Sequence, residues 1–459
     1  MDWTPTLSDT AAPVFMRIVD ALAEDVASGR LGRGQQLPTH RALAKALDLD
    51  LTTVTRAYGE ARRRGLIDAQ VGRGTFVSET TARTAHDMPA QVKINLSMII
   101  PPQPVEAGLD GHIARGLKAI QEQYGFSAFL NYQQPGGSDN ERETAARWLR
   151  PRVRPARADR LVIYPGNQAI LFNALLALTS PGDVILTESV TFPGIKAAAD
   201  KLGVRLVGVA MDDQGVLPDA LAASCKKHRP KAVYLMPTLH NPTTATMRPE
   251  RRKAIAGIIR DHDTILIEDD AYGCLVPSIA PLANLIPERT YLAVGLAKCI
   301  APALRVSYLL VPDDAAAQIM RANLQATMLM PAQLMVALVT HWLHTGTADK
   351  IITAIRNEAA ARQQLAHRVL RGIAFAGQPH AHHIWMPLPQ RWSRSDFLAH
   401  MQNRGLAIVG DDAFTVDGST SLPAVRISLG AARHRAELAQ ALQFIADTLR
   451  SSTRSAQIV

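Results

Sequence analysis

Apolar positions follow two different patterns along the chain. In the first 80 residues they recur at helical spacing over 14–28, 40–47 and 51–64, and then alternate over 66–77. From about residue 110 onward, helical stretches alternate with short, mainly apolar runs. These runs are 160–164, 183–186, 205–209, 232–236, 264–267 and 291–294. Such runs separated by helices are typical of an α/β fold with a mostly parallel sheet buried on both faces.

The first three helical stretches carry the residues that begin and end helices. Thr39 and Asp50 precede the second and third stretches, where each side chain can cap the helix, and Gly65 follows the third. Two short helices with a tight connection predict a helix-turn-helix, whose second helix lies in the major groove of DNA. The alternating stretch predicts a hairpin, and its Gly-Arg-Gly tip at 72–74 lets an arginine approach the DNA closely.

The two patterns predict a multi-domain protein, which agrees with a length of 459 residues. The N-terminal domain is expected over residues 10–78. Residues 79–94 are small, polar and without periodicity, which is typical of a linker. The second domain is expected over 95–450, with a small C-terminal α+β subdomain from about 340 to 450. Residues 451–459 are expected to form a frayed tail.

Composition and charge narrow the class of protein. The chain is 47% hydrophobic and 20% charged, and no apolar run approaches the roughly 20 residues of a membrane span. The N-terminus does not resemble a signal peptide and the three cysteines form no CxxC pair, so we expect a cytoplasmic protein without a disulfide framework. Within 30–73, nine basic residues face four acidic ones, which indicates a polyanionic partner for the first domain.

One lysine of the second domain has the surroundings of a reactive amine. Lys298 lies between apolar runs, which lower the pKa of an ammonium group, and a neutral amine can attack an aldehyde. Arg305 can supply a cation for a phosphate, and the helix that opens at Gly166, Asn167 and Gln168 offers free N–H groups. A reactive lysine and a phosphate site together meet the requirements of pyridoxal 5'-phosphate (PLP).

Other polar or aromatic residues follow the ends of the predicted strands, where ligands bind in sheets of this kind. Asp269 can keep the pyridine nitrogen of PLP protonated. Asn241 and Tyr272 can hydrogen-bond the ring oxygen, and Phe192 can stack on the ring. The run His380-Ala-His382-His383 invites a metal site, but no carboxylate or cysteine is near it in the sequence. We therefore interpret this run as part of a strand.

The N-terminal stretch resembles a GntR-type winged helix over its full length. The resemblance rests on Gly34-Gln-Gln-Leu-Pro-Thr-His-Arg41-Ala-Leu-Ala, Thr53-Val-Thr-Arg56-Ala-Tyr58, Gly65-Leu-Ile and Gly72-Arg-Gly-Thr-Phe-Val77. It implies that six residues contact double-stranded operator DNA: Arg41, Thr52, Thr53, Arg56, Arg73 and Gly74. Gln36 and Leu51 stand where basic residues are usual in the family, so we expect DNA-backbone contacts to be kept while the base preference differs.

The second part resembles the fold-type I aminotransferases over roughly residues 95–450. The resemblance implies that Lys298 forms an aldimine with PLP and that Arg426, in Ala424-Val-Arg-Ile-Ser, binds the carboxylate of an amino compound. It gives the remaining PLP contacts to Asp269, Asn241, Tyr272 and Arg305. It also implies that Tyr132, in Asn131-Tyr-Gln-Gln-Pro-Gly136, reaches the phosphate bound by a second copy of the chain, and hence a homodimer.

Four positions depart from the pattern of these aminotransferases. Gly295 replaces the serine that is usual three residues before the lysine, and Ala297 replaces a small polar residue. Phe192 stands where tyrosine is common, and Thr244 stands where the Asn-Pro-Thr motif usually ends in glycine. We therefore expect weaker PLP binding and no assured transamination cycle.

A winged helix joined by a linker to an aminotransferase-like domain resembles the MocR subfamily of GntR regulators. The resemblance implies a transcriptional regulator in which the aminotransferase fold senses PLP or a small amino-compound effector. Two alternatives remain open from the sequence. One is a working aminotransferase that keeps a DNA-binding head, and the other is a regulator that no longer holds PLP.

Overall fold

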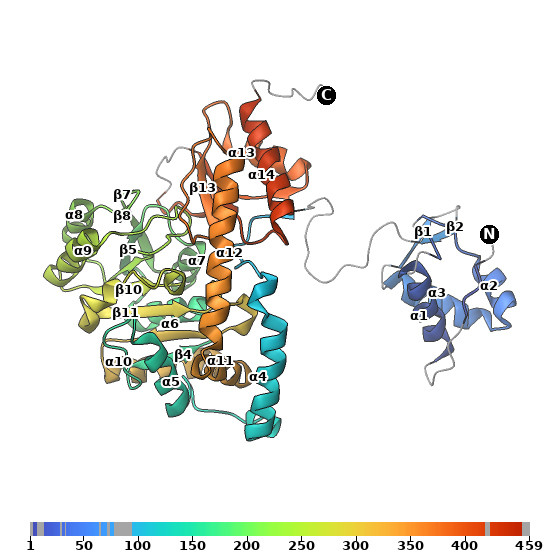
Figure 1. Ribbon diagram of the computed structural model, residues 1–459, viewed down its shortest axis with the longest axis horizontal. Helices are drawn as coiled ribbons and strands as arrows, with labels where there is room; N and C mark the ends of the chain where they lie inside the picture. Colours follow the sequence, from blue (N-terminus) through green and yellow to red (C-terminus); the bar gives the residue numbers. More distant parts are fainter. Residues whose placement is uncertain are drawn as a thin grey trace. The chain divides into compact units, whose positions relative to one another are not determined.

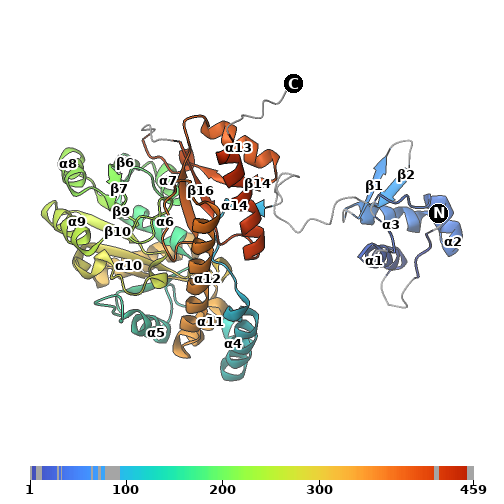
Figure 2. The same cartoon turned by 45° about the horizontal axis from the view of Figure 1, so that its top comes forward.

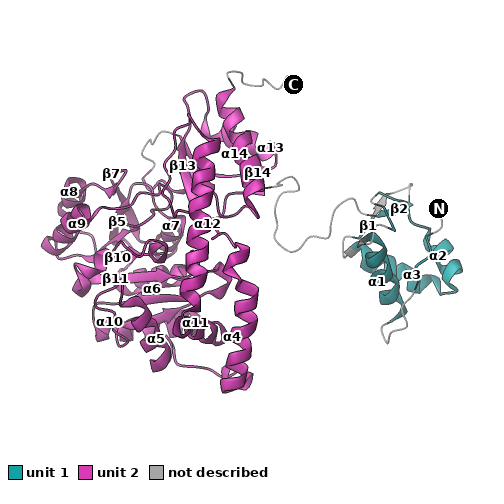
Figure 3. Ribbon diagram, viewed as in Figure 1, with its two compact units in different colours: residues 1–90 teal, residues 91–459 magenta. Residues whose placement is uncertain are grey.

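The computed structural model describes residues 3–6, 13–27, 30–32, 34–63, 66–70, 74–77, 94–417 and 423–451. The chain forms two compact units, residues 1–90 and 91–459 (Figure 3). The boundary between the units falls within the predicted linker, 79–94, of which only Ile94 is among the described residues. Of the predicted tail, only Ser451 is described.

The first unit has the helices and hairpin that its pattern predicts. Helices α1 (Val14–Ala27), α2 (His40–Leu47) and α3 (Leu51–Arg63) precede the antiparallel strands β1 (Ile67–Gln70) and β2 (Gly74–Val77). Thr39 caps α2 by accepting the amide of Ala42, and Asp50 accepts the amide of Thr52 at 2.7 Å. The core of the unit is formed by residues from all three helices and the hairpin: Ile18, Leu22, Leu43, Val54, Tyr58, Ile67 and Val77.

The second unit is built on a seven-stranded sheet in the order β4-β12-β11-β10-β9-β5-β6 (Figure 1). The strands are β4 (Leu161–Tyr164), β5 (Val184–Glu188), β6 (Arg205–Val209), β9 (Ala232–Leu235), β10 (Ile265–Asp269), β11 (Thr290–Gly295) and β12 (Ser307–Leu310). Of the seven strands, β12 alone runs in the opposite direction to the others, so the predicted mostly parallel sheet is confirmed. The sequence pattern gave six of these strands and did not separate β12 from the apolar run after Arg305.

Helices cover both faces of this sheet, which explains why its strands are apolar throughout. Leu186, Val233 and Leu266 pack with α8 (Pro218–His228) and α9 (Pro249–Asp261). Their neighbours in sequence face the opposite side, where α6 (Asn167–Leu178) packs. That layer also contains α4 (Leu109–Tyr124), α5 (Asp139–Leu149), α7 (Pro193–Leu202), α10 (Asp314–Met328) and α11 (Gln333–His344).

A small C-terminal subdomain follows the long helix α12 (Thr347–Val369), which runs from the large sheet region to the subdomain (Figures 1 and 2). It holds the antiparallel sheet β13-β16-β15, made of His383–Pro387, Ala424–Ser428 and Val409–Gly410, with α13 (Arg394–Asn403) and α14 (Arg435–Arg450). Its separate core includes Leu96, which comes from the start of the unit, beside the parallel pair β3 (Ile94–Asn95) and β14 (Leu406–Ala407). In the described parts of the chain, no helix has both the length and the apolar character needed to cross a membrane.

A buried ion pair fixes the chain just after β10. Arg152 donates two hydrogen bonds to Asp270, one of them 2.8 Å long, and the Asp270 side chain is 0% exposed. The Arg157–Asp159 pair makes a matched comparison, because its side chains are 56% and 39% exposed.

We expect Asp270→Asn to lower the free energy of unfolding of the second unit by about 3–5 kcal/mol, because it leaves the Arg152 cation buried without a counter-charge. Asp159→Asn should change it by less than about 1 kcal/mol, since exposed ion pairs contribute little. Urea unfolding of the two variants measures both values. Equal decreases in the free energy of unfolding for the two variants would show that the buried pair stabilises the unit no more than the exposed pair does.

Candidate functional site

Sheet order brings the predicted lysine and carboxylate to one edge of the large sheet. Asp269 ends β10 and pairs in register with Ala293 of the neighbouring strand β11. Lys298 follows the end of β11, in the turn that leads to Arg305 and β12. Because β10 and β11 are parallel, both residues lie at their carboxyl ends, where ligands bind in folds of this type.

Lys298 is largely enclosed and its amine is held by the main chain. Its Nζ donates a hydrogen bond of 2.7 Å to the carbonyl oxygen of Ile99. Burial lowers the pKa of Lys298 to about 8, and the positive charges of Arg426 and Arg305 act in the same direction while Asp269 opposes them. About a tenth of the amine is therefore uncharged at pH 7, far more than for an unperturbed lysine, and the uncharged form is the one that attacks an aldehyde.

Asp269 is buried, and two side chains donate hydrogen bonds to its carboxylate. Asn167 Nδ2 lies 2.7 Å from Oδ1 and the Tyr234 hydroxyl lies 3.0 Å from Oδ2. Burial raises the pKa of Asp269 to about 6, while these hydrogen bonds act to lower it. Tyr234 was not among the predicted site residues. The signal for it was a single hydroxyl group inside the otherwise apolar run of β9.

Asn167 occupies space that only glycine at position 295 leaves free. A Cβ atom on Gly295 would lie 2.5 Å from Asn167 Oδ1 and 2.9 Å from its Cγ. Asn167 is the first residue of α6, where the sequence suggested a phosphate contact. Its side chain instead turns toward Asp269, so its backbone N–H is the group left for a phosphate. Glycine at position 295 therefore has no hydroxyl group to offer, but it leaves room for the Asn167 amide to reach the carboxylate.

The predicted phosphate residues meet at the start of α6. A Cβ atom on Gly166 would lie 2.7 Å from Arg305 Nη2, so the guanidinium lies directly against the Gly166 backbone. Gln168 donates to the carbonyl oxygen of Gly194 at 2.8 Å. A Cβ atom on Gly194 would also lie 2.2 Å from the Phe192 ring, so that ring lies next to Gln168. The structure thus brings Phe192 and Gln168 to one place, beside the start of α6.

Arg426 projects from β16 and joins several predicted residues. Its Nη1 donates to Asn241 Oδ1 at 2.8 Å, its Nη2 donates to the carbonyl oxygen of Ser97, and its guanidinium carbon lies 4.8 Å from the centre of the Phe414 ring. Burial lowers the pKa of Arg426 to about 10. Its Nε is buried and has no hydrogen-bond partner among the described residues, so it keeps a donor for an incoming carboxylate.

Two histidines of the run 380–383 hold the main chain near these residues. His382 Nε2 lies 2.7 Å from the carbonyl oxygen of Lys298, and His383 Nε2 lies 3.2 Å from that of His240, next to Asn241. Burial lowers the pKa of His382 to about 4, so its imidazole is neutral near pH 7. His383 begins β13, whereas residues 380–382 precede the strand, so the expected strand includes only the last residue of the run. The contacts of the two imidazoles show that this run helps to position the main chain at Lys298 and next to Asn241.

The set of donors fits PLP. The Tyr272 hydroxyl is buried, and it has no hydrogen-bond partner among the described residues, as a ligand to a ring oxygen would require. Asp269 is a buried carboxylate of the kind that a pyridine nitrogen needs, and Lys298 has an amine that could react with the aldehyde. Arg305 with Gly166 suits the phosphate. Tyr132 lies in the loop after η2 (Phe126–Phe129), with its side chain 82% exposed and available to a second chain.

The predicted DNA contacts lie on the first unit. Arg41, on α2, and Thr52 and Arg56, on α3, are exposed, whereas Thr53 is half-buried. The Arg56 guanidinium carbon lies 4.5 Å from the centre of the Phe15 ring. Gly74 begins β2 with φ +116°, and a side chain there would meet Gln36 Nε2 at 2.7 Å. Arg73 lies outside the described residues.

The fold and the buried polar residues around Lys298 define a fold-type I aminotransferase-like domain that follows a winged helix. Comparison with known families agrees. The family described as aminotransferase class I and II matches residues 93–445, and bacterial regulatory proteins of the gntR family match residues 16–77. The chain belongs to the class I and II aminotransferase family and carries a gntR-family domain at its N-terminal end. It is thus a GntR-type regulator with an aminotransferase-like domain, consistent with the MocR type.

Individual relatives match this chain over most of their own length. The uncharacterized HTH-type transcriptional regulator YdeF of Bacillus subtilis is 28% identical, over 97% of this chain and 96% of its own. The HTH-type transcriptional regulator TauR of Rhodobacter capsulatus is 26% identical, over 85% of this chain and 87% of its own. LysN, the alpha-aminoadipate aminotransferase of Thermus thermophilus, solved with N-(5'-phosphopyridoxyl)-L-leucine, shares the fold with a TM-score of 0.71 and 22% identity, over 78% of this chain and 92% of its own.

The fit between Asn167 and Gly295 can be tested by a double-mutant cycle. We expect Gly295→Ser to lower the free energy of unfolding by about 1–3 kcal/mol, because its Cβ overlaps the Asn167 carboxamide. In an Asn167→Ala background the same change should be milder, with a coupling energy of about 1 kcal/mol or more. Urea unfolding without added ligand gives the four values. Strict additivity would mean that the two side chains do not compete for this space.

Proposed function

We propose that the protein is a homodimeric transcriptional regulator that binds double-stranded operator DNA through residues 10–78 and senses PLP, a small amino compound, or both through residues 95–450. The observation that carries the proposal is the enclosed Lys298 amine, whose pKa is affected by Asp269, Arg305 and Arg426, in a chain that also has a gntR-family domain. A DNA partner implies action in the cytoplasm.

Each residue of the site has a task when PLP is bound. PLP supplies an aldehyde that reacts with amines and a ring that withdraws electrons. Lys298 offers its uncharged amine, and Asp269 holds a proton on the pyridine nitrogen. Tyr272 and Asn241 orient the ring oxygen, and Phe192 covers one face of the ring. The start of α6 (Gly166, Asn167 and Gln168) and Arg305 hold the phosphate, with Tyr132 reaching the phosphate of the second copy.

Arg426 is the proposed binding group for the carboxylate of an amino-compound effector. A guanidinium can grip a carboxylate with two hydrogen bonds, and the buried Nε is a donor with no partner among the described residues. An effector can shift the regulator between two states only if it binds one of them better. In a dimer, such a shift changes how two winged helices meet paired half-sites on DNA.

A working aminotransferase is the second candidate function, because the complete set Lys298, Asp269, Tyr272 and Arg426 is kept together. Consumption of amino donors in the presence of a keto acid would favour this candidate. Two of the relatives that span most of this chain bear the names of transcriptional regulators, which supports the regulatory function as the main one.

Lys298 should determine the spectrum and the pH dependence of PLP binding. We expect PLP to give a visible absorption band with the full chain, and we expect Lys298→Ala to lose it. Lys118→Ala, which alters a lysine of α4 whose side chain is 76% exposed, should keep the band. Because the pKa of Lys298 is about 8, the attachment rate should rise about tenfold per pH unit below pH 8 and level off above it. Stopped-flow absorbance measures this. A rate that still rises from pH 9 to pH 10 would contradict the low pKa.

The winged helix should bind DNA through its basic residues. Affinity for a promoter fragment should fall steeply with salt, and Arg41→Ala and Arg73→Ala should each reduce the slope of log K against log salt by about one. Arg157→Ala, an exposed arginine of the second unit, is the control and should leave the slope unchanged. Fluorescence anisotropy at several salt concentrations gives these slopes. Unaltered binding by the first two variants would disprove the proposed interface.

A further inference from the structure

The net positive charge of the chain lies in its second unit. Residues 1–90 contain 11 lysines and arginines and 11 acidic residues, whereas the whole chain contains 50 and 41. Residues 91–459 therefore contain 39 lysines and arginines and 30 acidic residues, and they carry the entire formal net charge of +9. Net charge of this kind governs association with polyanions such as nucleic acid. A surface of the second unit on which the excess gathers is thus a candidate contact for a polyanion.

Five exposed cations lie at one edge of the large sheet, at the amino ends of its strands. We name this set the basic edge: Arg205, Lys226, Lys227, Arg229 and Lys231. The first of them begins β6, and the other four lie at the end of α8 and just before β9. Those four belong to a stretch, 220–249, that contains no acidic residue. The basic edge is therefore the part of the second unit where the sequence concentrates positive charge.

Strand pairing and the end of α8 bring these cations together. Arg205 pairs in register with Val184, the first residue of β5. From the other side of β5, Lys231 donates its amide to the carbonyl oxygen of Val184 at 2.9 Å. Strands two places apart lie about 10 Å from each other, so Arg205 and Lys231 flank the start of β5 closely. Two residues separate the end of α8 from Lys231, so the cations of the helix end lie at this edge too.

The cations of the basic edge are not used in ion pairs within the part of the chain that the structure describes. Two carboxylates of the same edge are occupied by other groups. Asp183, which precedes β5, accepts the amide of Ser180 at 2.8 Å, and Asp263, which precedes β10, pairs with Arg289 at 2.5 Å. The charge of the basic edge is therefore directed to solvent.

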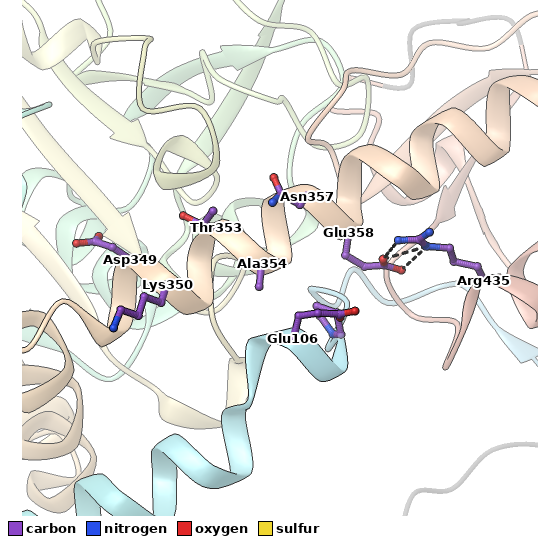
Figure 4. Close-up of a pocket in the computed structure, with 9 residues that line it drawn as sticks. Glu106, Asp349, Lys350, Thr353, Ala354, Asn357, Glu358 and Arg435 are labelled. Atoms are coloured by element: carbon purple, nitrogen blue, oxygen red, sulfur yellow. Dashed lines mark hydrogen bonds and ion pairs between the residues drawn. The ribbon is translucent and has the colours of Figure 1, made fainter.

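A cavity beside α12 on the same unit shows the opposite arrangement. It has a volume of about 650 Å³, and its charged lining includes Glu106, Lys350, Glu358 and Arg435 (Figure 4). Both signs of charge occur there, and Arg435 pairs with Glu358 at 2.5 Å. The charges of this cavity largely balance one another, so the cavity does not account for the positive excess of the unit.

The surroundings of the basic edge favour the backbone of a nucleic-acid duplex over other polyanions. A helix that binds a membrane surface presents apolar side chains to the bilayer, whereas Leu221 and Cys225 of α8 pack in the core. Single-stranded nucleic acid is bound by aromatic rings on which bases stack. Among the described residues from 177 to 284, no large hydrophobic or aromatic side chain is exposed. Lysine and arginine without such neighbours suit the phosphates of a duplex.

We propose that the basic edge is a second DNA-binding surface, which contacts backbone phosphates of the duplex that the winged helix binds. The presence of DNA rests on the proposed function, whereas the basic edge is a feature of the structure itself. Because its cations contact phosphates and not bases, this contact does not depend on the base sequence. The winged helix already holds the duplex, so a contact that is weak by itself acts at a high effective concentration and raises the overall affinity.

The test measures the affinity of the full chain for a promoter fragment at several salt concentrations, with double variants. Lys226→Gln with Lys227→Gln should reduce the magnitude of the slope of log K against log salt by about two for each copy of the edge that contacts DNA. Lys118→Gln with Lys350→Gln removes the same charge from exposed lysines outside the edge and should leave the slope unchanged. Lys226→Arg with Lys227→Arg keeps the charge and should keep the slope.

The length of the DNA gives an independent readout. The unaltered chain should bind a promoter fragment that is extended at both ends with unrelated sequence several-fold more tightly than a fragment trimmed to the part that the winged helix covers. The Lys226→Gln, Lys227→Gln variant should bind the two fragments with similar affinity, because it has lost its contacts to the added phosphates. Exchanging the added sequence for another should have no effect, since phosphates carry no sequence information.

The outcomes separate this proposal from the proposed function. If the Lys226→Gln, Lys227→Gln variant has the slope of the control pair while Arg41→Ala reduces it, the second surface is rejected and the proposed function stands. If the variant reduces the slope and neither Arg41→Ala nor Arg73→Ala does, the winged-helix interface is wrong and the basic edge stands. A chain that binds no DNA overturns both. An unchanged DNA slope together with weaker binding of the variant to phosphatidylserine vesicles would assign the edge to a membrane surface and overturn the proposal.

Discussion

The site depends on keeping a carboxylate ionised where the sheet allows almost no water. Asp269 is 2% exposed, and burial alone would favour its neutral form. Two donors from different elements, Asn167 at the start of α6 and Tyr234 on β9, offset that tendency. Strand order places Tyr234 there, because β9 is a neighbour of β10, whereas Asn167 reaches the carboxylate from α6 past Gly295 at the end of β11. The parallel sheet therefore supplies the location of the carboxylate and one of the two groups that stabilise its charge.

The same carboxylate bears on one departure from the aminotransferase pattern, the glycine at position 295. Glycine at position 295 removes a hydroxyl, but it also opens the space through which Asn167 reaches Asp269. A serine at this position would need the volume that the amide fills. The two positions are thus one packing arrangement, in which a contact near the phosphate is exchanged for a contact on the ring-nitrogen side. Phe192 and Arg305 remain beside the start of α6, so the phosphate site is reduced and not removed.

Much of this architecture follows from the sequence, because periodicity and helix caps are local properties. Thr39 and Asp50 cap the helices that their positions indicated, and six apolar runs became strands. β12 was not predicted as a separate strand because Ser307–Leu310 follows the turn at Arg305 directly. Its direction could not be predicted either, since an apolar run alone does not indicate strand direction. The direction of the Asn167 side chain could not be predicted, since it depends on a neighbour far away in the chain. The hydrogen bonds accepted by the carbonyl oxygens of Ser97 and Ile99 could not be predicted either, because a main-chain carbonyl group is present in every residue and its side chain does not indicate its partner.

Those carbonyl oxygens accept hydrogen bonds from the two cations of the site, Lys298 and Arg426, when no ligand is bound. A buried lysine and a buried arginine each need acceptors, and an unpaired buried cation is unfavourable by several kcal/mol. Here the acceptors come mainly from the stretch of main chain that leads toward the winged helix. A ligand that supplies better acceptors does not simply add contacts, because it also removes the partners of that main-chain stretch. Binding energy is therefore divided between holding the ligand and releasing the carbonyl oxygens of Ser97 and Ile99 from these two cations.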